Sequence, residues 1–301
     1  MIPNRQPHPL RPAQRAGLIG TRAALAALAP IQRWRRARAG HDRIEVHRYG
    51  TRRGETLEIL RPAPRTQARP PVVYVHGGGW IFGRKEFYSA DLAFLTRRGH
   101  TVYNLEYPLA PEHPFPVPLL SLVAALAWIR RGDPEIGGVH LMGDSAGGNL
   151  ALMLGLICAD PKRFACLDPA LENCALPSAR SVVSLYGVLD RLSWLENGFP
   201  GARLMLHCYG GPAAFEASVG PELCLTPADL EVVARPPCLL AIGSADPLAE
   251  SSRIAHARLR KNAERIELIE YPDERHGFFN TPWRPASQKL RADVVRFLDE
   301  V

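Results

Sequence analysis

The stretch Val-His-Leu-Met-Gly-Asp-Ser-Ala-Gly-Gly-Asn at residues 139–149 decides how the rest of this sequence is interpreted. A run of strand-forming residues ends at Gly143, Ser145 follows at a turn, and an Ala- and Leu-rich helical segment starts directly behind it. This is the context of a Gly-x-Ser-x-Gly nucleophile elbow, in which a sharp turn lifts the serine hydroxyl above a sheet at the positive end of a helix. Gly143 and Gly147 are expected because a Cβ atom at either position would clash with the neighbouring strand or helix. Ser145 is the candidate nucleophile, and an ordinary turn serine is the weaker interpretation.

Around this stretch, from about residue 42 onward, the sequence alternates strand-like and helix-like segments. Such alternation predicts an α/β fold with a mostly parallel eight-stranded sheet flanked by helices. The expected strands are residues 43–49, 55–61, 71–75, 101–106, 138–142, 181–186, 237–242 and 265–270. The expected helices are residues 88–98, 119–131, 146–159, 248–262 and 285–299.

Three stretches, residues 1–40, 160–180 and 188–235, do not fit the alternation. The last contains helix-sized pieces broken by Pro and Gly, and a structureless loop of that length is rare in a compact domain. We therefore expect a helical cap excursion at 188–235, with the basic N-terminal arm 1–40 as part of the cap. Residues 41–187 and 236–301 then form the catalytic domain.

Composition and charge limit the function classes. Hydrophobic residues make up 46% of the 301 residues and charged residues 22%, which excludes a largely disordered or fibrous chain. No uncharged apolar run reaches the roughly 18 residues of a membrane-spanning helix. Residues 1–53 hold twelve arginines against two acidic residues, a net charge of +10, so the remaining 248 residues carry −3. A basic arm can touch membranes or polyanions, but we expect a solvated, Arg-rich cap helix, with no nucleic-acid partner and no membrane contact.

The sequence also bears on the compartment. Residues 23–29, Ala-Ala-Leu-Ala-Ala-Leu-Ala, have the outline of a signal peptide's apolar stretch, but they are short and Pro30 follows directly, so a helix of the mature protein is expected. Six cysteines, at 158, 166, 174, 208, 224 and 238, form no Cys-x-x-Cys pair. They are interpreted as reduced, mostly buried thiols of a cytoplasmic protein, with export or membrane association as the weaker alternative.

A second motif, His76-Gly77-Gly78-Gly79-Trp80, directly follows the expected strand 71–75. Consecutive glycines at a strand's carboxyl end let backbone N–H groups approach a ligand closely, so the N–H groups of Gly77, Gly78 and Ala146 could form an oxyanion hole. A phosphate-binding glycine loop is the alternative, but no Lys-Ser/Thr follows as in a P-loop. His76 itself is expected to be structural, its imidazole fixing the loop by hydrogen bonds.

A nucleophilic serine needs a base and a group that orients the base, in the chain order Ser, Asp or Glu, His. Asp246 follows the expected strand 237–242, and His276 follows the expected strand 265–270. Both therefore fall at the carboxyl ends of consecutive strands. Glu250 lies one helical turn beyond Asp246 and is expected to brace the loop or cap the following helix.

These motifs together resemble the hormone-sensitive-lipase-like esterases of the α/β-hydrolase fold. The resemblance rests on five blocks that occur in family order, namely residues 76–80, 107–116 (Tyr-Pro-Leu-Ala-Pro-Glu-His-Pro-Phe-Pro), 143–148, 246–250 and 276–278. It implies that Ser145, Asp246 and His276 form the triad and that Gly77, Gly78 and Ala146 are the oxyanion donors. Five further residues of these blocks are expected to be supporting residues, namely His76, Gly79, Trp80, Asp144 and Glu250. Pro108 stands where relatives often have an Arg, so an ion pair that tethers residues 107–116 is expected to be missing.

The sequence therefore predicts a serine carboxylesterase that acts on small esters of short to medium chain length. No metal or organic cofactor is implied, and a homodimer is left open. Three alternatives remain: an arylformamidase or other amidase with the same triad, a non-catalytic ligand-binding protein on the same fold, and a polyanion- or membrane-binding protein driven by the basic arm.

Overall fold

The computed structural model describes residues 6–64, 67–231, 234–260 and 265–301. Its single eight-stranded sheet has the order β1-β2-β4-β3-β5-β6-β7-β8. The strands are β1 (Arg43–Arg48), β2 (Thr56–Arg61), β3 (Arg69–Val75), β4 (His100–Leu105), β5 (Val139–Asp144), β6 (Ala179–Leu185), β7 (Cys238–Gly243) and β8 (Ile266–Tyr271). Only the β1–β2 and β2–β4 pairs are antiparallel. All eight predicted strands and the mostly parallel α/β architecture are confirmed, each boundary within two residues.

Four of the five predicted helices are confirmed: α4 (Val117–Gly132), α5 (Ala146–Ala159), α8 (Ala249–Leu259) and α9 (Pro285–Glu300). The last two residues of the predicted helix 248–262 lie outside the described residues. The prediction of one continuous helix over residues 88–98 is wrong. A 3-10 turn, η1 (Lys85–Phe87), precedes this segment, and the segment itself contains a single helical turn, α3 (Ala93–Thr96). Its residues are buried on nearly all sides, so tertiary packing rather than one apolar helical face sets the backbone.

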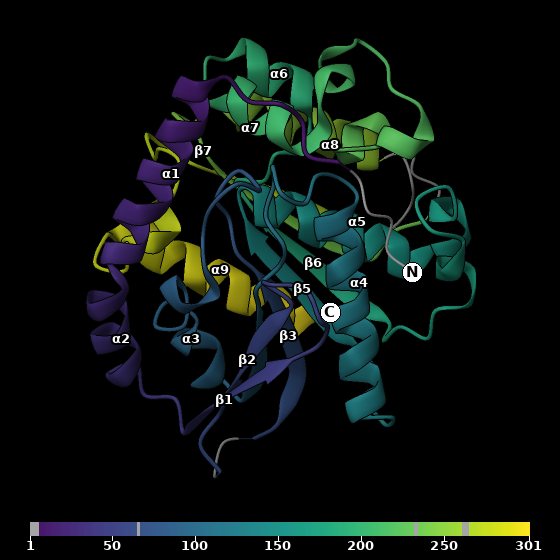
Figure 1. Cartoon of the computed structure of the whole chain (residues 1–301). Helices are drawn as coiled ribbons and strands as arrows, with labels where there is room; N and C mark the ends of the chain where they lie inside the picture. Colours follow the sequence, from purple (N-terminus) through teal and green to yellow (C-terminus); the bar gives the residue numbers. More distant parts are fainter. Residues whose placement is uncertain (1–5, 65–66, 232–233, 261–264) are drawn as a thin grey trace.

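The sheet is covered on both faces, with α3 and α9 on one side and α4 and α5 on the other (Figure 1). The central parallel strands β3, β5, β6 and β7 are therefore buried along most of their length. Helix α5 is buried from Ala146 to Ile157, since it lies directly against β5 and β6. The core thus fixes the strand–helix junction on which Ser145 lies.

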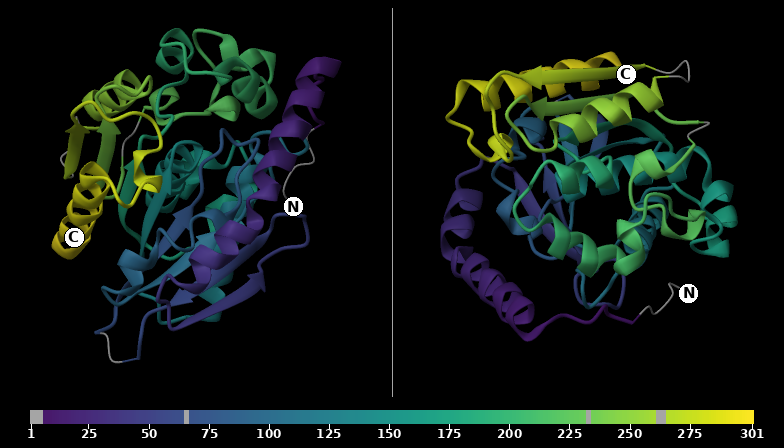
Figure 2. Two further views of the ribbon diagram at one scale, coloured as in Figure 1. Left: turned by 90° about the vertical axis from the view of Figure 1, so that its left-hand side faces the viewer. Right: turned by 90° about the horizontal axis from the view of Figure 1, so that it is seen from above.

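Above the carboxyl ends of the strands lie α6 (Arg191–Glu196) and α7 (Ala202–Gly210), followed by the 3-10 turns η4 (Pro212–Phe215), η5 (Pro221–Leu223) and η6 (Pro227–Asp229) (Figures 1 and 2). The arm forms α1 (Pro12–Ala27) and α2 (Ala29–Ala37), and α1 runs along the side of the molecule towards α7. The His207 imidazole Nε2 lies 3.0 Å from the Pro9 carbonyl, which joins the arm to α7. We therefore propose the arm 1–40 and residues 188–235 as one cap on a catalytic domain of 41–187 and 236–301.

The other expectations have mixed outcomes. The apolar run 23–29 is helical in the described structure, within α1 and the start of α2. Residues 160–180 contain two 3-10 turns, η2 (Pro161–Phe164) and η3 (Pro169–Asn173). All six cysteines are free, but only three are buried and Cys166 is exposed, so "mostly buried" is wrong for half of them. No helix in the described part of the chain has the length and apolarity to cross a membrane.

Candidate active site

Ser145 lies on a strained turn between β5 and α5. Its φ of 52° and ψ of −121° fall in a region that non-glycine residues rarely adopt. The predicted need for glycine on either side is confirmed. A Cβ atom on Gly143 would lie 2.2 Å from the Gly147 carbonyl oxygen, and one on Gly147 would lie 2.1 Å from the Val75 carbonyl oxygen. The turn therefore closes only with glycine at these two positions.

The structure brings the three predicted triad residues together. His276 Nε2 lies 3.0 Å from Ser145 Oγ, and His276 Nδ1 lies 2.8 Å from Asp246 Oδ2. The Asp246 side chain is fully buried, and its Oδ1 accepts the Leu248 N–H at 2.9 Å. The carboxylate therefore holds the imidazole with one oxygen and is itself fixed by the other. This arrangement can pass a proton from the serine hydroxyl to the imidazole.

Glu250 takes no part in this arrangement. Its side chain is 52% exposed and its carboxylate lies 3.5 Å from the guanidinium of Arg253 on the same helix. The expectation that it braces the loop or caps α8 is wrong, because the first turn of the helix directs it outward to solvent. The Leu248 N–H next to the helix start is bound by Asp246 instead.

The predicted oxyanion donors need one correction, at Gly77. Its N–H donates to Asp144 Oδ1 at 2.7 Å, within a buried cluster in which Asp144 also accepts the hydroxyls of Tyr74 (2.8 Å) and Tyr88 (3.1 Å). Burial raises the pKa of Asp144, although these hydrogen bonds act against the rise. A backbone N–H that is already bound in this way is not available to a substrate oxygen.

The next two glycines of the motif are better placed. Within the described part of the chain, the N–H groups of Gly78, Gly79 and Ala146 make no backbone or side-chain hydrogen bond. Ala146 is the first residue of α5, where the N–H group has no partner inside the helix. The candidate oxyanion hole therefore consists of these three N–H groups, and Asp144 anchors the loop that presents two of them.

His76 and Trp80 fix the two ends of the glycine loop. The His76 ring is buried, stacks on Tyr107 at 4.5 Å, and its Nδ1 lies 2.7 Å from the Gly77 carbonyl oxygen. Burial alone would lower the pKa of His76, but the nearby Glu106 carboxylate raises it overall. Trp80 is fully buried and its ring stacks on Tyr209 of α7 at 4.3 Å. The contacts of His76 agree with the structural role expected for it, and the Trp80 ring packs the loop against α7.

Three residues near the triad carry no sequence motif and were missed. The rings of Tyr186 and Phe199 lie 4.8 and 4.9 Å from the His276 ring, both edge-on. Met205 of α7 covers the glycine loop, since a Cβ atom on Gly79 would lie 2.3 Å from its sulfur. Phe199 and Met205 belong to the proposed cap, whose sequence has no periodic pattern that would single them out.

The tether of residues 107–116 is present, although Pro108 replaces the expected Arg. Arg22 of α1 supplies it with a guanidinium that bonds both oxygens of Glu112 (2.7 and 3.0 Å) and the carbonyls of Ala110 (2.7 Å) and Ile81 (2.9 Å). The expectation of a missing ion pair is therefore wrong, since a residue of the arm replaces the local one. The arm thereby also contacts the end of the glycine loop.

A cavity of about 440 Å³ lies between α1 and residues 82–87 and 106–113. None of the triad residues lines it, and Arg22 and Glu112 in its wall pair with each other. Among the described residues, no three His, Cys, Asp or Glu side chains are arranged to hold a metal ion.

Comparisons with known proteins agree with this geometry. A family model described as an α/β hydrolase fold matches residues 72–280. The chain is 29% identical to esterase LipC of Mycobacterium tuberculosis in an alignment 249 residues long that covers 77% of this chain and 60% of LipC. It is 28% identical to carboxylesterase NlhH of the same organism in an alignment 233 residues long that covers 70% of this chain and 67% of NlhH. The crystal structure of esterase LipW from Mycobacterium marinum superimposes with a TM-score of 0.78 at 26% identity, covering 98% of each chain.

Proposed function

This chain belongs to the α/β-hydrolase-fold family, in its hormone-sensitive-lipase-like branch, and on that premise we propose that it is a serine carboxylesterase. One observation carries the proposal, namely the continuous hydrogen-bonded row from Ser145 Oγ through the His276 imidazole to Asp246. Relatives of this chain are named esterases, which supports an ester over another acyl compound as the substrate.

In the proposed reaction, Ser145 Oγ attacks the ester carbonyl carbon while His276 Nε2 takes the hydroxyl proton. The imidazolium then gives this proton to the leaving alcohol, which leaves an acyl enzyme. Water attacks the acyl enzyme by the same route, and the carboxylic acid is released. The N–H groups of Gly78, Gly79 and Ala146 would stabilise the negative charge on the carbonyl oxygen in both steps.

We further propose a preference for acyl groups of about two to eight carbons. Phe199 lies against His276 and Met205 lies against Gly79. These side chains of the proposed cap limit the length of the acyl chain that fits beside the proposed triad. A series of p-nitrophenyl esters of increasing acyl length measures this preference. The proposal predicts that kcat/KM peaks within the range and that Met205→Ala moves the peak to longer chains. Faster hydrolysis of emulsified long-chain triglyceride than of a short ester would contradict it.

A fluorophosphonate probe tests the nucleophile directly. Labelling is expected at Ser145 alone, and Ser145→Ala should lower kcat by about 10⁴–10⁶. Ser244→Ala is the matched control, because Ser244 lies on the loop after β7 and its hydroxyl accepts the Asp273 N–H. Parallel assays with a p-nitrophenyl ester and the matching anilide separate an esterase from an amidase. Equal activity of Ser145→Ala and the wild type would overturn the proposed function.

A further inference from the structure

His276 lies at the start of a short loop that leads into α9. Gly277, with a φ of 83°, begins the turn, and the 3-10 helix η7 (Phe278–Asn280) follows. Thr281 closes the turn by donating its N–H and its hydroxyl to the Phe278 carbonyl at 3.2 and 2.6 Å. Because this turn is short, the position of the imidazole depends on what holds the turn against the body of the protein.

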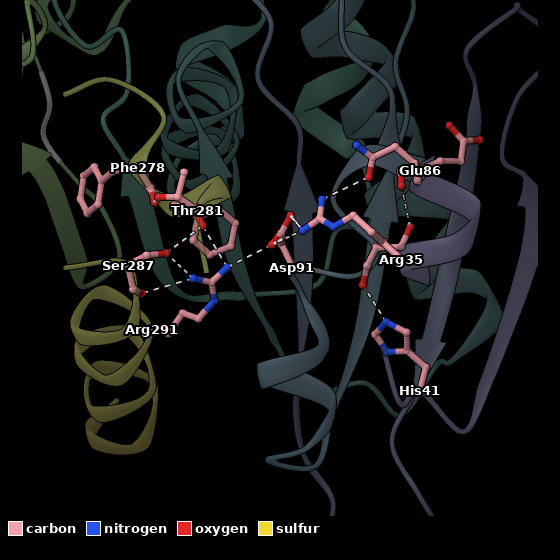
Figure 3. Close-up of polar contacts among 11 residues, drawn as sticks. Arg35, His41, Glu86, Asp91, Phe278, Thr281, Ser287 and Arg291 are labelled. Carbon is pink, nitrogen blue, oxygen red and sulfur yellow. Dashed lines mark hydrogen bonds and ion pairs between the residues drawn. The ribbon is translucent and has the colours of Figure 1, made fainter. Parts of the chain in front are cut away.

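Arg291 of α9 contacts this turn from the body of the protein. Its guanidinium donates to the Phe279 carbonyl at 2.9 Å and lies 4.5 Å above the Phe279 ring. The same guanidinium bonds the hydroxyl and the carbonyl of Ser287, whose hydroxyl also donates to the Phe279 carbonyl at 3.0 Å (Figure 3). Arg291 therefore fixes both the backbone and the ring of a residue only three positions after His276.

The charge of Arg291 is balanced from the opposite side by Asp91. The side chains are 13% and 2% exposed, and their N···O distance is 3.2 Å. Asp91 also accepts two hydrogen bonds from Arg35 of α2, at 3.0 and 3.1 Å (Figure 3). Burial raises the pKa of Asp91 against the effect of the two guanidinium groups, and burial lowers the pKa of Arg291. A carboxylate this deeply buried stays ionised only while cations remain beside it.

We propose that Arg291 is a positioning residue for His276, and that Arg35 of the N-terminal arm acts on the same loop through Asp91. Arg291 does not touch the reacting atoms. It keeps the His276 loop at the distance at which Nε2 meets Ser145 Oγ, and Asp91 keeps Arg291 pointing at Phe279. A displacement of about 1 Å in such a group can lower a rate about a hundredfold. The inference rests on the proposed function, because it presupposes that His276 is the base.

The first experiment compares Arg291→Gln, Arg291→Lys and the matched control Arg296→Gln on a short p-nitrophenyl ester. Arg296 lies on the same helix with a 41% exposed side chain, paired with surface glutamates. The rate is divided by the number of active sites, which is counted from fluorophosphonate labelling of Ser145. We expect Arg291→Gln to lower kcat per active site about tenfold to a hundredfold with KM changed less than threefold. Arg291→Lys should recover part of the loss, and Arg296→Gln should stay within twofold.

The readout separates positioning from mere stability. If Arg291 only stabilises the fold, Arg291→Gln lowers the melting temperature and the number of active sites, while kcat per active site stays at the wild-type value. That result would overturn the inference. Ser145→Ala in the same assay reports on the proposed function separately, since a fully active Ser145→Ala variant means that the triad, and not only the role of Arg291, has been misassigned.

A double-mutant cycle tests the route through Asp91. Arg35→Gln alone should lower kcat per active site about threefold to tenfold, and Arg33→Gln, on the exposed side of the same helix, should not change it. If Arg35 acts through Asp91 and Arg291, then Arg35→Gln causes little further loss in the Arg291→Gln background. Independent, multiplying losses would show that Arg35 acts by another route.

Discussion

Replacing Asp246 by Asn removes one charge and one acceptor at the end of the proposed triad. In the wild type, Oδ2 faces His276 Nδ1 at 2.8 Å and Oδ1 accepts the Leu248 N–H at 2.9 Å. An amide side chain has only one oxygen, so it can accept from one of these two groups and must turn its NH₂ group towards the other. The side chain is fully buried, so water cannot take over the lost role.

Both orientations of the amide are costly. With the oxygen on Leu248, the NH₂ group donates to Nδ1, the imidazole proton moves to Nε2, and His276 can no longer accept the Ser145 proton. With the oxygen on His276, two donors face each other at Leu248, which costs about 1–3 kcal/mol. The imidazolium formed during the reaction also loses a carboxylate partner worth about 3–4 kcal/mol at an effective dielectric constant near 20. Together these effects amount to about 4–7 kcal/mol, which corresponds to a loss of about 10³–10⁵ in kcat.

The assay is kcat for a short p-nitrophenyl ester, with circular dichroism and the melting temperature as checks on folding. Glu250→Gln is the control, because Glu250 is 52% exposed and pairs only with Arg253 in the described structure. It should lose tenfold or less. A greater loss in Glu250→Gln than in Asp246→Asn, or an Asp246→Asn variant within tenfold of the wild type, would refute the assignment of Asp246 as the acid that orients His276.

Three further predictions concern the parts around the triad. Asp144→Ala frees the Gly77 N–H from its 2.7 Å bond, which should lower kcat about tenfold to a hundredfold with little change in KM, as measured by steady-state kinetics. Burial lowers the pKa of His140 to about 3, so below pH 6.5 the unfolded chain binds a proton that the folded chain refuses. His140 should then lower the free energy of unfolding by about 1.4 kcal/mol for each pH unit between 6.5 and about 3, and in urea titrations His140→Asn should show a pH slope smaller than that of the wild type by this amount. Deleting residues 1–40 should lower the melting temperature and raise KM while Ser145 still reacts with a small phosphonate; full activity with only vesicle binding lost would instead favour a membrane role for the arm.

The sequence predicts the sheet and the tight turn at Ser145 because both depend on local patterns. Buried parallel strands are short apolar runs between turn residues, and an elbow serine requires glycine on either side for steric reasons. The prediction of one helix over residues 88–98 fails because the side chains are buried on several sides, so the segment has no single apolar helical face.

The oxyanion loop shows where local reasoning ends. Three consecutive glycines predict a hole, but not which N–H groups face it. That choice depends on Asp144, which is 67 residues away in the chain and accepts a hydrogen bond from the first of the three N–H groups, that of Gly77. In the same way, Arg22 lies 90 residues from Glu112, so the absence of an Arg at position 108 could not reveal that the tether comes from the arm.

The charge of the arm has a physical explanation in the fold. Arg35 and Arg36 of α2 pair with Asp91 and Glu58, two carboxylates outside the arm with side chains 2% and 1% exposed. Since a buried carboxylate needs a nearby cation, a mildly acidic body that buries such groups requires a basic segment to cover them. Part of the positive charge of residues 1–53 is thus neutralised by buried carboxylates of the same molecule, against which the arm packs. An Arg-rich segment therefore indicates a polyanion partner only if arginines remain after those that pair with buried carboxylates of the same chain have been subtracted.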